Sequence, residues 1–197
     1  MGRNYDIAVI AGDGIGKEVV PEGQRVVEAA ARRFGFSVNW KEYDWSCDYY
    51  ARHGRMMPED GVEQVRGSHA IFLGAVGWPN VPDHISTWDL ILRLRRELNL
   101  YVALRPARLL KGITSPLAGR DAKDIDFVIV RENSEGEYSS AGGILYQGTP
   151  EELVIQESVF SRRATDRILR YAFELARTRR NKVSLATKSN GIKIAMP

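Results

Sequence analysis

Three arginines lie where a folded chain could bring their side chains together around an anion. Arg95 lies in a stretch with helical periodicity, and Arg105 and Arg131 each lie at the end of an apolar run typical of a strand. A guanidinium group is planar and permanently charged, so it can bind a carboxylate through paired hydrogen bonds. Any one of the three alone is more typical of a surface residue. Together, two of them at strand ends, they favour a carboxylate-binding site.

Two further side chains could transfer protons. Tyr138 follows Arg131 in the same polar segment, and a phenol near cationic groups can act as a general acid. Lys188 lies at the end of a predicted strand, where partial burial or neighbouring positive charge can make an amine a usable base. Taken singly, each is more commonly a solvated residue.

A glycine-rich loop covers residues 12–16, at the end of the first apolar run. Glycines at such a turn allow the backbone to approach a phosphate at a helix N-terminus. The dinucleotide-binding fingerprint is incomplete, however, because Lys17 occupies the position of its last glycine. By itself the loop is equally consistent with a structural turn.

Other residues argue against several classes of site. His53, His69 and His84 lie far apart without metal-ligand spacing, and the single cysteine, Cys47, excludes an internal disulfide and favours a packing role in a reducing, cytoplasmic compartment. The net charge is only +3 and the basic residues are dispersed, which disfavours nucleic acid as a partner. The longest apolar run suits a buried strand, so no membrane span is expected.

The apolar periodicity predicts an α/β fold in which strands alternate with helices. Such alternation favours an open, parallel sheet with helices on both faces. Glycines within 142–148 indicate a hairpin arm. The expected strands are 6–11, 37–43, 70–73, 101–105 (ended by Pro106), 126–131, 153–157 and 183–188, and the expected helices are 15–34, 58–66, 87–98 and 159–179.

Four blocks, in this order, resemble the β-decarboxylating dehydrogenases, the family of the isocitrate, isopropylmalate and tartrate/D-malate enzymes. They are residues 12–16, 94–106, 130–138 and 187–190. Within that family, residues 77–79, 81–86 and 135–140 are most similar to the tartrate and D-malate dehydrogenases. The resemblance extends over essentially the whole chain.

The resemblance implies an isocitrate/isopropylmalate dehydrogenase-like fold with two domains. Residues 1–104 would be the first part of the large, cofactor-side domain, and residues 105–197 the small substrate and dimerisation domain. An arm at about 137–157 would clasp the second subunit of a homodimer. Family members are considerably longer, so we expect a chain truncated at its C-terminus and inactive alone, with the metal-binding aspartates beyond residue 197 and no metal ligand within it.

The resemblance also implies roles for individual residues in NAD-dependent oxidative decarboxylation of a malate-like 2-hydroxy acid. Carboxylates would bind Arg95, Arg105 and Arg131. Lys188 would take, or relay, the hydroxyl proton in the partner subunit's site, and Tyr138 would protonate the enolate. A Mg²⁺ or Mn²⁺ ion would act as Lewis acid, with a monovalent cation such as K⁺ as a further option. The residues expected near the NAD are Gly14, Ile15, Gly74 and Asn190.

Residues 87–98 bear on which small dicarboxylate is the substrate. Asp89 would repel a third carboxylate, which disfavours isocitrate; alternatively it pairs with Arg93 one turn later. Ile91 and Leu92 could form an aliphatic patch, which leaves 3-isopropylmalate as an alternative to D-malate and tartrate. A different class of function, an inactive carboxylate-binding or dimerisation fragment, also stays open, as does the choice between NAD and NADP.

Overall fold

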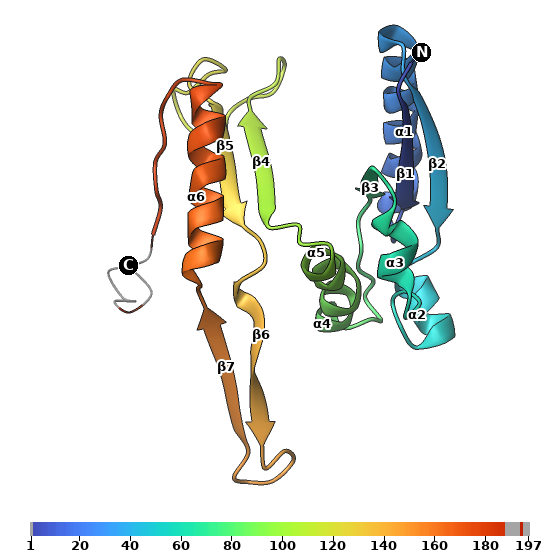
Figure 1. Ribbon diagram of the computed structural model, residues 1–197, viewed down its shortest axis with the longest axis vertical. Coiled ribbons are helices and arrows are strands. Elements are labelled where there is room, and N and C mark those ends of the chain that lie inside the picture. Colours follow the sequence, from blue (N-terminus) through green and yellow to red (C-terminus); the bar gives the residue numbers. More distant parts are fainter. Residues whose placement is uncertain (1, 188–193, 195–197) are drawn as a thin grey trace. The chain divides into compact units, whose positions relative to one another are not determined.

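The computed structural model describes residues 2–187 and 194 (Figure 1). The chain divides into two compact units, Met1–Asn99 and Leu100–Pro197. Two of the predicted site residues, Lys188 and Asn190, lie outside the described residues. Among the described residues, no helix combines the length and apolar character that a membrane span requires.

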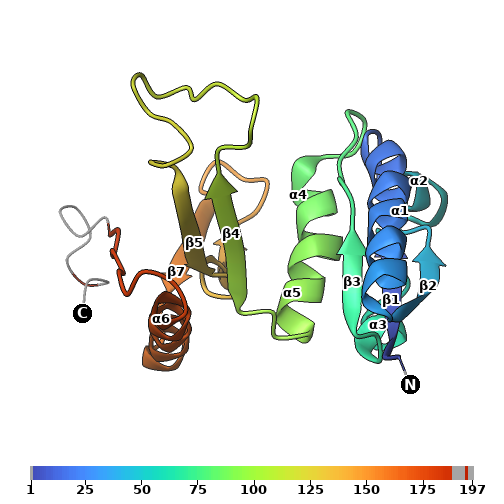
Figure 2. The ribbon, with the colours of Figure 1, turned by 90° about the horizontal axis from the view of Figure 1, so that it is seen from above.

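The first unit contains a three-stranded sheet in the order β2–β1–β3, and both strand pairs are parallel (Figure 2). The predicted parallel arrangement is therefore confirmed for these strands. The helix that links the first two strands ends at Gly35, whose φ of 72° lies in the left-handed region that glycine readily adopts. The elements are β1 (Asn4–Ile10), α1 (Gly16–Phe34), β2 (Ser37–Tyr43), α2 (Cys47–His53), α3 (Gly61–Arg66) and β3 (Ala70–Leu73).

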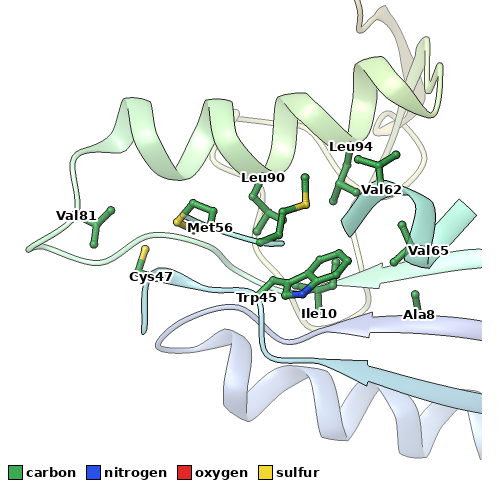
Figure 3. Close-up of a cluster of buried hydrophobic side chains, with 11 residues drawn as sticks. Ala8, Ile10, Trp45, Cys47, Met56, Val62, Val65, Val81, Leu90 and Leu94 are labelled. Carbon is green, nitrogen blue, oxygen red and sulfur yellow. The ribbon is translucent and has the colours of Figure 1, made fainter. Parts of the chain in front are cut away.

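Helical segments cover both faces of this sheet. Successive side chains of a strand point to opposite faces, and Ala8 and Ile10 on one face lie in the main hydrophobic core, around Trp45 (Figure 3). On the other face, Phe72 lies so close to α1 that a Cβ at Gly23 would come within 2.6 Å of its ring. Helices on both faces, as predicted, are thus present in the first unit.

The predicted helix at 87–98 is part of a longer helical segment with a π-helical centre. It consists of α4 (Asp83–Ser86), the π-helix η1 (Thr87–Leu92) and α5 (Arg93–Glu97). Leu90 and Leu94 from this segment are buried in the main core. Arg93 Nε donates to Glu97 at 2.9 Å rather than pairing with the exposed Asp89, so the alternative Asp89–Arg93 pair is wrong.

The predicted parallel sheet is wrong for the second unit, which is built from antiparallel pairs. β4 (Val102–Arg108) pairs with β5 (Asp126–Glu132), β6 (Gly136–Leu145) forms a hairpin with β7 (Leu153–Val159), and α6 (Arg162–Arg177) packs against β5. The hairpin predicted around residues 142–148 is confirmed as a local structure.

The predictions of a strand ended by Pro106 and of a strand at 183–188 are wrong. β4 continues through Pro106 to Arg108. Alternate residues of a strand in a two-stranded ladder direct their N–H away from the partner, and a proline at such a position removes no ladder bond. The strand predicted at 183–188 is not formed over its described residues, 183–187. A strand needs a hydrogen-bonded neighbour, and none of the described strands pairs with this segment.

Ion pairs join α6 and the residues after it to both ends of β5. At one end, Arg167 of α6 lies 3.0 Å from Glu132. At the other end, Asp126 accepts hydrogen bonds from Arg179 at 2.8 Å and from Arg108 at 3.2 Å. These two arginines lower the pKa of the Asp126 carboxyl group to about 2.

We expect Asp126→Asn to lower the urea midpoint for unfolding at neutral pH. Because the folded-state pKa is depressed, the ionised carboxylate stabilises the fold fully above its ordinary pKa of 3.8, and this contribution disappears as the pH falls through about 2. The difference between wild type and variant should therefore shrink between pH ~4 and pH ~2. Asp166→Asn, which removes an exposed ion pair with Arg162, is the control and should have little effect. Equal midpoints for wild type and Asp126→Asn at neutral pH would contradict this role.

Candidate active site

The loops after β1 and β3 lie at the position where open α/β sheets bind ligands. In the sheet order β2–β1–β3, the next strand in sequence, β2, lies on one side of β1, and β3 lies on its other side. The strand order therefore reverses direction at β1. Ligands of such sheets bind beyond the carboxyl ends of the strands, at this switch in strand order. The glycine loop of residues 12–16 follows β1 there, and residues 74–78 follow β3.

A buried carboxylate ties these two loops together and joins a third loop to them. Asp13 is only 2% exposed. Its carboxylate accepts hydrogen bonds from the backbone N–H of Cys47, at 3.0 and 3.1 Å, and of Gly77, at 3.1 Å. Its own N–H donates to the Ala75 carbonyl at 2.7 Å. The backbone of the glycine loop is therefore held in a defined conformation by contacts within the first unit.

The glycines of this region serve two different purposes. A Cβ at Gly12 would lie 2.0 Å from the Ala75 carbonyl oxygen, and a Cβ at Gly74 would lie 2.2 Å from that of Ala11. Backbone packing thus explains these two glycines without a ligand. Gly14, in contrast, has a φ of 46° and is exposed, and its neighbour Ile15 is 58% exposed. Of the three described residues predicted to contact a cofactor, Gly14 and Ile15 are accessible, whereas Gly74 supports the loop.

Trp78 is a further accessible side chain, for which the sequence alone predicted no role in the site. It is 48% exposed, and its ring lies 3.8 Å from the position that a Cβ on Gly14 would take. A large aromatic group left half-exposed beside a rigid loop at strand ends is suited to contact a flat ligand. In the sequence, its position directly after the glycines that follow β3 could have indicated that it lies near the site.

Cys47 has the packing role predicted for it. The residue is 2% exposed, and burial, together with the nearby Asp13 carboxylate, raises the pKa of its thiol to about 12. Since the thiolate is the nucleophilic form, this side chain is chemically inert in the folded state. His69 is also structural, because its Nδ1 accepts the backbone N–H of Asp6 at 3.0 Å.

The second unit brings three predicted site residues together. In the antiparallel register Ala103 lies opposite Arg131, and Arg105 lies opposite Ile129. Opposite residues share a face, as do residues two apart in one strand, so Arg105 and Arg131 are diagonal neighbours on one face. The guanidinium carbon of Arg131 also lies 5.2 Å from the ring centroid of Tyr138. We call Arg105, Arg131 and Tyr138 the Arg–Tyr cluster.

The third predicted arginine, Arg95, does not belong to the same unit as this cluster. Arg95 lies on α5 of the first unit and is half-buried. In the part of the chain that the structure describes, no group of three His, Cys, Asp or Glu side chains could hold a metal ion. The cluster therefore offers two cations and a phenol, a set suited to binding a carboxylate and donating a proton beside it.

Comparisons with known proteins agree on one family. The family model for isocitrate/isopropylmalate dehydrogenases matches residues 6–196. The chain is 58% identical to the D-malate dehydrogenase [decarboxylating] of Escherichia coli (strain K12), with 100% of the chain and 55% of that protein covered. It is 56% identical to the tartrate dehydrogenase/decarboxylase of Pseudomonas putida, with 99% and 54% covered. The chain thus spans about half the length of these relatives.

Solved structures agree with this result. The crystal structure of isocitrate dehydrogenase from Methylococcus capsulatus matches with a TM-score of 0.78 at 30% identity, over 96% of this chain and 52% of that one. A β-decarboxylating dehydrogenase from Thermococcus kodakarensis matches with a TM-score of 0.64 at 33% identity, over 96% and 50%.

The Asp13 contacts predict a large loss of stability for Asp13→Ala. The variant leaves the buried N–H of Cys47 and the partly buried N–H of Gly77 without their acceptor, at about 1–3 kcal/mol for a buried group and less for a partly buried one. We expect the free energy of unfolding, measured by urea denaturation with tryptophan fluorescence, to fall by about 2–4 kcal/mol. Asp6→Ala, which removes a half-exposed carboxylate from β1, is the control and should cost much less. A loss for Asp13→Ala no larger than this control would show that the loops do not depend on Asp13.

Proposed function

The chain belongs to the isocitrate/isopropylmalate dehydrogenase family, and from this premise we propose that it contributes to the NAD-dependent oxidative decarboxylation of a malate-like 2-hydroxy acid. The two relatives with the identities given above are named for D-malate and tartrate, which supports these substrates over 3-isopropylmalate. Because the chain spans about half the length of those relatives, the complete reaction would also use residues of the kind that they carry in their other half.

The observation that carries the proposal is the Arg–Tyr cluster. Arg105 and Arg131 project from one face of the β4–β5 ladder, so a small dicarboxylate could bind both guanidinium groups through one carboxylate. Tyr138 lies against Arg131 and would donate a proton to C3 of the enolate left after CO₂ departs. In this proposal Arg95 binds the other carboxylate, and Lys188 takes or relays the C2 hydroxyl proton.

Two of the residues proposed to contact the cofactor lie in the first unit. Gly14 and Ile15 are exposed on a loop that Asp13 holds rigid at the switch in strand order, and they would contact the cofactor together with Asn190. The bound NAD would accept the hydride from C2 of the substrate. We propose that the reaction also needs Mg²⁺ or Mn²⁺, with K⁺ as a further option. Among the described residues, no group of three His, Cys, Asp or Glu side chains could hold such an ion.

We also propose that the β6–β7 hairpin clasps a second copy of the chain in a homodimer. An isolated two-stranded hairpin is marginally stable in water unless another element covers its apolar side chains. Every residue of β7 is exposed in this chain. The large apolar side chains left exposed near the hairpin tip are Ile144, Leu145, Tyr146, Leu153, Val154 and Ile155.

The proposed roles predict different effects for two substitutions. They can be tested in a chimera in which residues 1–197 replace the matching part of the Escherichia coli relative. Arg131→Lys keeps the charge but loses the paired hydrogen bonds, so we expect KM for D-malate to rise about tenfold or more. Tyr138→Phe keeps the ring against Arg131 but removes the proton donor, so kcat should fall by about 10²-fold or more with little change in KM.

NADH formation in the presence of Mn²⁺ is the measurement. Tyr171→Phe, a change at a tyrosine of α6 that has no proposed role, is the matched control and should leave kcat unchanged. A chimera that turns over neither D-malate nor tartrate would overturn the proposed function. Full activity in Tyr138→Phe would overturn only the proposed role of the phenol.

A further inference from the structure

The two residues at the end of β5 point to opposite faces of the β4–β5 ladder. Arg131 projects to the face that carries Arg105, whereas Glu132 projects to the face covered by α6. The Glu132 carboxylate accepts four hydrogen bonds there: from the backbone N–H and hydroxyl of Ser134, at 2.8 and 2.6 Å, from the Glu135 N–H at 2.8 Å, and from Arg167 at 3.0 Å. Its contacts therefore define the turn that leads from β5 to β6.

The Glu132 side chain is only 20% exposed, and that of Arg167 only 21%. Burial alone would raise the pKa of Glu132, but the hydrogen bonds from Ser134, Glu135 and Arg167 outweigh it and lower the pKa below its ordinary value. The carboxylate is consequently ionised at neutral pH. The guanidinium carbon of Arg167 also lies 4.5 Å from the ring centroid of Tyr101, which further fixes its position.

A second carboxylate connects the same turn to the start of α6. Glu135 accepts the backbone N–H of Ser161 at 2.6 Å and its hydroxyl at 2.7 Å. Ser161 is the N-cap of α6, and its side-chain oxygen accepts the N–H of Ala164. The turn 132–135 is thus attached to α6 at two places, and it separates Arg131 from Tyr138.

We propose that Glu132 is a positioning residue, which acts with Arg167 of α6 to fix the direction in which Arg131 projects toward Tyr138. The inference rests on the proposed function in so far as Arg131 and Tyr138 are the residues proposed to bind and protonate the substrate. The guanidinium group lies several bonds away from the backbone of Arg131. A small rotation of the backbone at the end of β5 would therefore move this group by a large distance. Reacting groups that are misplaced by about 1 Å can lose about 10²-fold in rate, so the anchor on the α6 face controls the chemistry on the other face.

The test compares side-chain contacts in variants of this chain by NMR, with arginine and tyrosine selectively labelled. The variants are Glu132→Gln, which keeps the size and a carbonyl acceptor but loses the charge, Arg167→Ala, and Arg167→Lys as the conservative rescue. Asp126→Asn is the matched control, because it removes the ion pairs at the other end of β5. Circular dichroism shows whether each variant retains its helices.

We expect nuclear Overhauser contacts between the Arg131 side chain and the Tyr138 ring in the wild type, in Asp126→Asn and, weakened, in Arg167→Lys. Glu132→Gln and Arg167→Ala should lose these contacts while they retain their helices. The same two variants should bind D-malate about tenfold more weakly than the wild type in ligand-observed NMR, and Asp126→Asn should bind as the wild type does.

Retention of the Arg131–Tyr138 contacts in both Glu132→Gln and Arg167→Ala would overturn the inference. So would an equal loss in Asp126→Asn, since any weakening of the α6–β5 interface would then suffice. A wild-type chain that shows the contacts but does not bind D-malate would count against the proposed function. The comparison of contacts among the variants would still decide the positioning role.

Discussion

The carboxylate of Asp13 lies buried where three loops meet, and it accepts hydrogen bonds from the backbone N–H groups of Cys47 and Gly77. Such groups are costly to bury without an acceptor. One side chain thereby satisfies two donors and holds together loops that are far apart in the sequence. In the second unit Glu132 and Glu135 satisfy backbone donors in the same way. In both units, carboxylates that accept backbone N–H groups hold the segments that carry the proposed chemistry.

This arrangement separates the residues that shape the loops from those that are free to contact a ligand. Gly74 lies against backbone, and Asp13 is enclosed, whereas Gly14, Ile15 and Trp78 are accessible. On β5 the same separation occurs between neighbours, because Glu132 is engaged on the α6 face and Arg131 contacts Tyr138. Alternation along a strand makes this possible, since adjacent residues point to opposite faces.

The second unit also contains elements that bury little apolar surface by themselves. Phe127 and Ile129 are about half exposed beside Arg131 on β5, at 49% and 50%, and all of β7 is exposed. Exposed apolar surface on this scale is typical of segments that pack against further protein. It agrees with a chain that spans about half the length of its relatives, and with the proposed clasp between two copies.

The sequence by itself determined the family and several of the local elements. The strands at 37–43 and 70–73 have the predicted bounds because short runs of strand-forming residues, one followed by Gly74, leave little choice of limits. The grouping of Arg105 with Arg131 was expected from predicted strand ends, but the antiparallel register produces it, because Arg105 lies inside β4 and not at its end. Only the tertiary structure decided the partners. It carried β4 through Pro106, left 183–187 without a strand, exposed Trp78 beside Gly14, and placed Arg167 against Glu132. Each of these outcomes depends on which segment lies next to another in space, and hydrogen bonding and burial between distant segments are not encoded in the periodicity of either one.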